Sequence, residues 1–244
     1  MLFRSGLFML RRMLRGYLAL IILLVTPMAV IAVLGLLTRG AIDPKLGIPV
    51  IDELIVTMII TFQLFGGMYT MEYIKSDLLS ATKWRLHALP YRLHQHAFSI
   101  ILSASLFSVF QGLTLVYLTR WIYGVNWGNI GLIILVLLLL SILTQLVFLN
   151  LILGLKSHKA AEACATAYGL VSVGLAGVWF PMPDSGILNF LTNYGNPLSL
   201  GRTVIIASWI GGHGDLILLD ILILCAALGV MGVTAIFLGK RKLI

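Results

Sequence analysis

The chain has 244 residues, of which 60% are hydrophobic and only 11% are charged, and its mean hydropathy is +1.04. Soluble domains carry about 25% charged residues, so this composition excludes an ordinary soluble domain and indicates an integral membrane protein made of apolar helices. The net charge of +8 does not indicate a nucleic-acid partner, because the basic residues lie where they set membrane orientation and contact lipid.

Residues 2–15 form the first element that the sequence predicts. Apolar side chains gather on one side of a helix, while Arg4, Arg11 and Arg15 recur at spacings of seven and four residues. This pattern is typical of an interfacial amphipathic helix, here lying on the inner leaflet. The simpler alternative is a basic flank that only sets the topology.

Six long apolar runs follow, each close to the roughly 20 residues that cross about 30 Å of hydrocarbon. The sequence therefore predicts an all-α integral membrane fold, with six transmembrane helices in a single transmembrane domain. That domain is expected to cover residues 1–244. We expect the six helices at residues 17–38, 54–71, 97–119, 130–155, 163–180 and 216–238.

Alternate connections between these runs hold most of the 17 lysines and arginines. The basic residues on the other side of the predicted topology are Arg39, Lys45, Arg120 and Arg202. The positive-inside rule then places the basic connections and both termini in the cytoplasm, which requires an even number of crossings. The prediction is a multi-pass protein of the cell (cytoplasmic) membrane.

The outer connection, residues 181–215, is too long for a turn. It contains three prolines and two apolar runs, residues 186–191 and 198–210, that are each too short to cross the membrane. Short apolar runs of this kind favour re-entrant or interfacial pieces buried against the protein. We therefore expect a re-entrant segment before the last transmembrane helix.

Motifs for nucleotide binding, zinc peptidases and serine hydrolases (GxxxxGK[ST], HExxH and GxSxG) are absent from the sequence. His94 and His96 are two residues apart, which turns them to different sides of a helix, and His213 lies among glycines. Asp52 and Glu53 are adjacent, but they are interpreted as a solvated helix start. We expect no catalytic residue, no metal site and no cofactor in this chain.

The polar residues expected deep within the spans are uncharged. Four of them are candidates for a substrate path: Gln63, Gln111, Gln145 and Asn150. Side chains of this kind most often form hydrogen bonds between helices, so lining a path is the alternative interpretation. The two cysteines lie within apolar runs and are expected to be buried.

The largest interruption on the predicted cytoplasmic side is the loop at residues 72–93, EYIKSDLLSATKWRLHALPYRL. Ser76 or Asp77 could cap a short helix after the second span ends. Leucines from Leu78 to Leu89 would form its apolar stripe, and Pro90 would stop it. The pattern predicts a short helix on a hinge with an apolar face that needs a cover. The alternative is an amphipathic linker lying on lipid.

With these features the chain resembles the membrane subunit of type-2 ABC exporters, the ABC-2 permease family. The resemblance extends over essentially the whole chain. It rests on the amphipathic segment 2–15, Glu72 after the second span, Lys83-Trp84-Arg85-Leu86, Ala88-Leu89-Pro90, and the outer connection 181–215.

The resemblance implies a permease without a nucleotide-binding domain, which works with a separate cytoplasmic ABC ATPase dimer that binds ATP and Mg²⁺. Glu72 would pair with Arg12 or Arg15 of the N-terminal helix. The residues that would couple to the ATPase are Glu72, Lys83, Trp84, Arg85, Leu86, Leu89 and Pro90.

The resemblance also implies a second permease chain, as a homodimer or with a related chain. The exported substrate would be amphiphilic: a peptide antibiotic, a lipid-like molecule or a drug. Two other functions remain open at this point. One is a stand-alone secondary transporter, which would need charged residues at mid-membrane or inverted repeats. The other is a membrane enzyme or scaffold.

Overall fold

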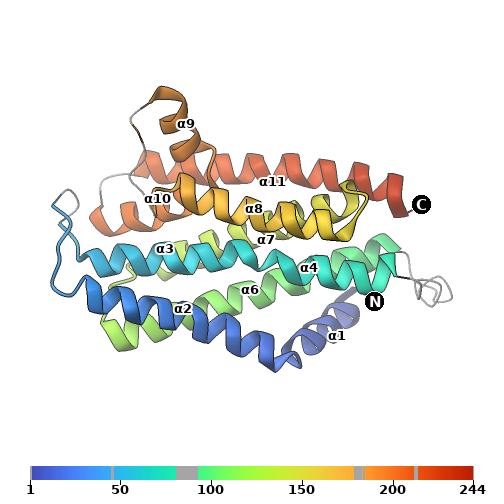
Figure 1. Ribbon diagram of the computed structural model, residues 1–244, viewed down its shortest axis with the longest axis horizontal. Coiled ribbons are helices and arrows are strands. Elements are labelled where there is room, and N and C mark those ends of the chain that lie inside the picture. The colour runs from blue at the N-terminus through green and yellow to red at the C-terminus, as the bar shows by residue number, and fades with distance from the viewer. Residues whose placement is uncertain are drawn as a thin grey trace.

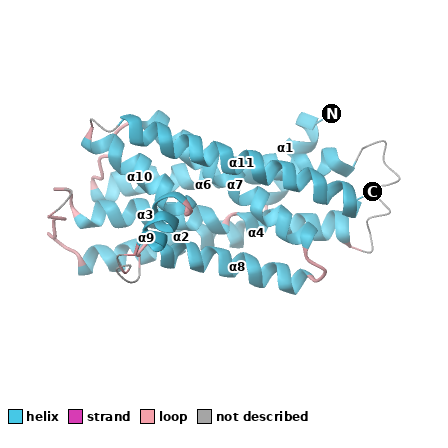
Figure 2. Cartoon of the chain, turned by 90° about the horizontal axis from the view of Figure 1, so that it is seen from above, coloured by secondary structure: helices cyan, strands magenta, loops and turns pink. Residues whose placement is uncertain are grey.

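The computed structural model describes residues 2–44, 47–80, 93–178, 183, 185–211 and 214–243. Within these ranges the long helices run along the longest axis of the molecule (Figure 1). The view from above shows the same helices lying side by side (Figure 2). The all-α class predicted from hydropathy is confirmed.

The first half of the bundle holds an oblique N-terminal helix, two helices joined by residues 38–49, and a short helix that continues into a π-helical turn. Their bounds are α1 Leu2–Leu14, α2 Tyr17–Leu37, α3 Val50–Phe65, α4 Gly67–Ile74 and η1 Lys75–Leu79. The second half holds α6 Leu93–Tyr123, α7 Ile130–Gly154, α8 His158–Leu175, α9 Gly186–Tyr194, α10 Pro197–Ile210 and α11 Gly214–Leu243.

Helix α7 lies at the centre and packs against α3, α4, α6, α8, α10 and α11. Its 25 residues span about 37 Å, and they are apolar on all sides, as befits a buried helix. Asn129 starts it by accepting hydrogen bonds from the amides of Gly131 and Leu132 at 2.9 and 3.4 Å. Near its other end the Phe148 ring occupies the space that a side chain on Gly67 would need. The absence of a side chain at Gly67 therefore permits the close approach of α4 and α7.

Four of the described helical stretches are long and apolar enough to cross a membrane: Val50–Leu79, Gln95–Tyr123, Ile130–Gly154 and Gly214–Lys242. Two shorter apolar helices accompany them, Ile21–Leu37 and Pro197–Ile210. The chain is thus a multi-pass helical membrane protein, whereas the count of six crossings stays a prediction.

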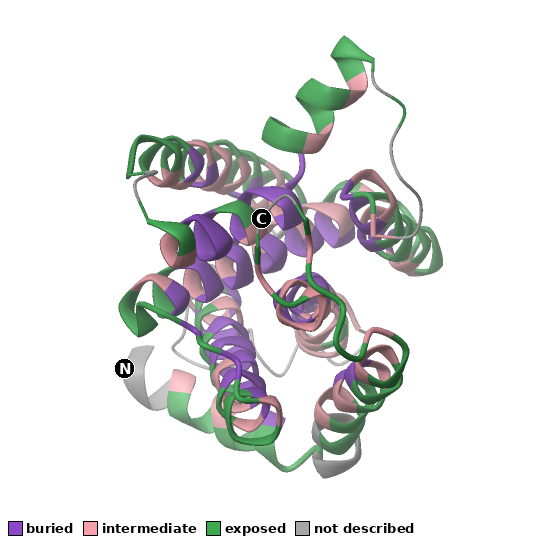
Figure 3. Ribbon diagram, turned by 90° about the vertical axis from the view of Figure 1, so that its left-hand side faces the viewer, coloured by how far each residue is buried: buried purple, intermediate pink, exposed green. Residues whose placement is uncertain are grey.

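The two short apolar runs of the outer connection form helices α9 and α10, which differ in burial. Helix α10 packs against α3, α7 and α11, and its Leu198 and Val204 are fully buried. Asn196 caps α10 by accepting from the Leu198 amide and donates to the Ser172 carbonyl of α8 at 2.8 Å. Helix α9 has no buried residue and projects from the bundle (Figures 1 and 3). Burial against the protein therefore holds for α10 and not for α9.

The prediction that the second span ends before Glu72 is wrong. The helix continues through α4 and the π-helical turn to Leu79, so Ser76 and Asp77 lie inside a helix and cap nothing. Their side chains have other partners, since Ser76 Oγ donates to the Tyr73 carbonyl at 3.2 Å and Asp77 binds residues of other helices, described below. Because both side chains are engaged in these contacts, neither is available to cap a new helix here.

The expected burial of the cysteines is also wrong. Cys164 on α8 and Cys225 on α11 are both exposed. Helix α11 packs mainly on α7 and α10 and leaves most of its length uncovered. A side chain added at Gly229 or Gly232 would meet no atom of this chain within 4 Å. These two glycines of α11 therefore do not mediate close helix packing within the described part of the chain.

Candidate functional site at the basic end

Both termini, the two flanks of residues 81–92, and the connection between α7 and α8 lie at the same end of the bundle (Figure 1). We call this the basic end. Its basic residues include Lys75, Lys156, Lys159, Lys240, Arg241 and Lys242. The predicted coupling residues Lys83, Trp84, Arg85, Leu86, Leu89 and Pro90 lie outside the described residues, so their role stays a prediction.

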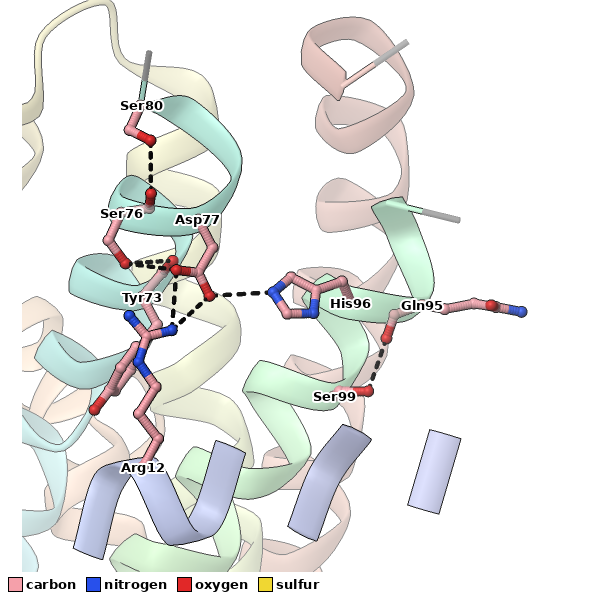
Figure 4. Close-up of polar contacts among 8 residues, drawn as sticks. All are labelled: Arg12, Tyr73, Ser76, Asp77, Ser80, Gln95, His96 and Ser99. Atoms are coloured by element: carbon pink, nitrogen blue, oxygen red, sulfur yellow. Dashed lines mark hydrogen bonds and ion pairs between the residues drawn. The ribbon is translucent and has the colours of Figure 1, made fainter. Parts of the chain in front are cut away.

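The carboxylate of Asp77 is the centre of a polar cluster on the helices that flank residues 81–92 (Figure 4). Arg12 Nη1 of α1 donates to Oδ1 and Oδ2 of Asp77 at 3.0 and 2.9 Å. His96 Nε2 of α6 lies 3.1 Å from Oδ2, and Ser76 Oγ donates to Oδ1 at 2.9 Å. One carboxylate therefore joins three helical elements, α1, η1 and α6.

Packing of the N-terminal helix brings Arg12 to this place. Helix α1 lies against α6 with Met9 and Met13 fully buried on its inner face. Arg12 follows on the edge of that face, where its guanidinium carbon lies 4.8 Å from the centre of the Tyr73 ring. The side chain of Asp77 is 15% exposed and that of Arg12 is 41% exposed. The pair is therefore only partly screened by solvent.

The position of this cluster defines what it can do mechanically. Asp77 stands four residues before segment 81–92, and His96 stands four residues after it. A displacement of that segment acts on η1 and on α6 directly, and the Asp77–Arg12 pair carries it to α1. The arrangement of the cluster suits the positioning of helices.

The predicted pairing of Glu72 with Arg12 is wrong, because Arg12 pairs with Asp77 instead. Glu72 is exposed, and its own cation is Lys75 on the same helix, at 3.9 Å. Five residues separate Glu72 from Asp77, which turns the two side chains roughly 140° apart on a regular helix. Asp77 consequently faces α1 and α6, whereas Glu72 faces α8.

The four candidates for a substrate path form hydrogen bonds between helices. Gln63 Nε2 donates to the Ser108 carbonyl at 2.8 Å, and Gln145 accepts from Thr70 of α4. The remaining two bonds run from Gln111 Nε2 to the Leu23 carbonyl at 3.1 Å and from Asn150 Nδ2 to Thr234 Oγ1 at 2.8 Å. The more common interpretation of such residues therefore applies, and a path along them stays a prediction.

Two features were not predicted from the sequence. Asp220 lies within the last predicted span and is 4% exposed, so the polar residues of the spans are not all uncharged. It makes no hydrogen bond or ion pair with a described residue. At the end opposite the basic end, Glu53 does not act as a solvated helix start, because it forms an ion pair with Arg202 of α10.

Comparison with known proteins gives one family. A family model described as ABC-2 type transporter matches residues 7–208, which extend from α1 into α10 and include the whole Asp77 cluster. No curated protein and no solved structure matches the chain. The match extends over well more than half of the 244 residues. The chain therefore belongs to the ABC-2 type transporter family.

Proposed function

We propose that the chain is the membrane-spanning permease subunit of an ATP-driven exporter in the cell membrane, with both termini in the cytoplasm. A separate ABC ATPase dimer binds ATP and Mg²⁺ and hydrolyses the ATP. Membership in a transporter family supports the permease role. The basic end supports the orientation, because lysines and arginines favour the cytoplasmic side.

The Asp77 cluster is the observation that carries this proposal. An ATPase that drives transport has to move helices inside the membrane, so its contact site needs a stiff connection to them. Segment 81–92 leaves a helix of the bundle at Leu79 and returns at Leu93, and Asp77 ties both flanks to α1. A push on this segment would therefore move several helices together.

In this proposal the segment docks into a groove of the ATPase. Trp84, Leu86 and Leu89 supply the apolar contact, Lys83 and Arg85 supply the polar rim, and Pro90 ends the docking helix. The last of the proposed coupling residues, Glu72, lies on the helix that leads into the segment.

The exported substrate is proposed to be amphiphilic: a peptide antibiotic, a lipid-like molecule or a drug. Spans that are mostly apolar, with uncharged amides among their polar groups, would suit such a substrate. A second permease chain, identical or related, would complete the path. Helix α11 leaves its apolar surface, including Gly229 and Gly232, uncovered, and this surface is available to lipid or to that second chain.

The test is retention of the ATPase by the purified chain. Leu86→Asp with Leu89→Asp places two carboxylates on the docking face, and we expect the ATPase to be lost while the chain stays inserted. Ala41→Asp with Ile42→Asp is the matched control, because both residues are exposed at the opposite end; it should retain the ATPase. Equal retention in both double variants would refute the coupling assignment.

One observation favours the alternative of a stand-alone secondary transporter. A buried carboxylate within a span is a common means of coupling transport to protons or cations, and Asp220 is such a residue. Asp220→Asn distinguishes the two functions. Under the proposed function, ATP-driven transport persists in this variant. Under the alternative, transport follows an ion gradient without ATP and is lost in the variant.

A further inference from the structure

Three side chains with metal-binding atoms meet where α4 lies beside the beginning of α8. They are Glu72 of α4 and His158 and Glu162 of α8, and each offers one ligand atom within 4.8 Å of the other two. Figures 1 and 2 both show the two helices next to each other at the basic end. This set was not foreseen from sequence motifs, because its members come from helices 86 residues apart in the chain.

The start of α8 places two of the three ligands. Ser157 caps the helix by accepting a hydrogen bond from the Ala160 amide at 3.1 Å, which makes His158 the first helical residue. His158 and Glu162 are separated by four residues, so their side chains share one face of the helix. His158 Nε2 lies 2.9 Å from Glu162 Oε1.

The histidine itself is the second, independent indication of a ligand. Both ring nitrogens of His158 are buried, and neither forms a hydrogen bond with the described residues, since the close approach to Glu162 does not have hydrogen-bond geometry. A buried polar atom without a hydrogen bond is unfavourable. A cation between the imidazole and the carboxylates would give Nε2 the missing partner.

We propose that Glu72, His158 and Glu162 bind a divalent transition-metal ion, for which Zn²⁺ is the probe. One imidazole nitrogen and two carboxylate oxygens form a donor set of borderline hardness, which suits Zn²⁺ better than Ca²⁺ or Mg²⁺. Water completes the coordination on the exposed side. Zn²⁺ holds tetrahedral ligand atoms roughly 3.4 Å apart, a spacing that the exposed Glu72 side chain reaches by rotation.

The ion would join α4, the helix leading into segment 81–92, to α8. Its competitor is the Lys75 ammonium, which lies 3.9 Å from Glu72 Oε2. Removal of this positive charge is therefore expected to strengthen metal binding. The proposal concerns binding alone and does not depend on the transport function.

The experiment is isothermal titration of Zn²⁺ into the full-length chain, purified in detergent without a polyhistidine tag. We expect one Zn²⁺ per chain, with affinity lowered at least about tenfold in Glu162→Gln and in His158→Gln. Glu162→His replaces one ligand by another and should restore binding, which separates loss of a ligand from misfolding. Lys75→Gln should bind more tightly than the natural chain.

Asp215→Asn is the matched control, because it removes an exposed carboxylate at the opposite end and should leave the titration unchanged. Absence of Zn²⁺ binding in the natural chain would overturn the proposal. Binding that persists unchanged in Glu162→Gln and His158→Gln would also overturn it, because the ion would then be bound elsewhere.

Discussion

The helical stretch Val50–Leu79 carries a paired carboxylate near each end, and the two pairs differ in what they join. Glu53 binds Arg202 of α10, a helix whose side chains are largely buried in the centre of the bundle. Asp77 binds Arg12 of α1 and His96 of α6, and α1 is a helix with one exposed face.

This difference indicates that the two ends serve different purposes. The Glu53 end is tied to the core, so it resists displacement. The Asp77 end is tied to a peripheral helix and stands beside segment 81–92, so it can transmit displacement. The proposed function, in which a separate ATPase supplies the force, would use one end of each kind.

The two ends should differ most in the side of the membrane from which an impermeant thiol reagent can label them. Lys83→Cys and Leu188→Cys, each in a chain with Cys164 and Cys225 replaced by alanine, should be labelled from opposite sides by an impermeant thiol reagent. The reagent would reach position 83 only after the cells are opened. Labelling of both positions from the same side would contradict the six-span topology.

Asp77→Asn should loosen α1. Arg12 loses its ionic partner, and the weaker hydrogen bonds of asparagine lower the opening free energy of α1 by about 2 kcal/mol. Backbone amides of Leu2–Leu14 should then exchange with deuterium about thirtyfold faster.

Glu72→Gln is the control for this effect, because Glu72 is exposed on the same helix and pairs with Lys75 rather than with Arg12. It should leave exchange in α1 unchanged. Equal acceleration in the two variants would mean that the Asp77 cluster does not hold α1.

Glu53→Gln should lower overall stability with little effect on α1. The Glu53 and Arg202 side chains are 17% and 29% exposed, so loss of the pair is expected to reduce the free energy of unfolding by about 1–2 kcal/mol. Denaturant unfolding in detergent measures it. Faster exchange confined to α1 would be the contrary outcome, since it would make the two ends equivalent.

The smallest effect is expected at His213 of the outer connection. It lies among glycines, far in the sequence from Glu53 and Asp77, so His213→Ala should leave the proposed ATP-driven transport in proteoliposomes unchanged. A loss of transport would show that the outer connection takes part in function and would revive a metal role for this histidine.

Most helices of this fold could be predicted from the sequence, because a membrane helix requires a continuous local run of apolar residues. Helix α7 begins at Ile130, as predicted, and helix α2 begins at Tyr17. Local pattern also placed the amphipathic helix α1. It failed at Asp77, which is bound by Arg12 and His96 of helices distant in sequence. It also failed at Ser76, which donates to the Tyr73 carbonyl and to Asp77 instead of capping a helix.

The site was less predictable, because partners of charged side chains are set by how helices rotate against one another. The sequence alone does not show whether Glu72 or Asp77 pairs with Arg12. The helical turn between the two carboxylates points them in different directions, and only Asp77 faces α1. The same turn brought Glu72 to His158 and Glu162. Asp220 is visible in the sequence as a lone carboxylate within an apolar run, and this signal could have indicated a buried charge.

Under the proposed function, force enters the membrane helices at the Asp77 end. Hydrogen–deuterium exchange of the complex with the proposed ATPase, with and without ATP, tests this most directly. ATP should change exchange in Leu2–Leu14 and in the first turns of α6, while Pro197–Ile210 stays constant. A change confined to Pro197–Ile210, with α1 and α6 unaffected, would contradict it.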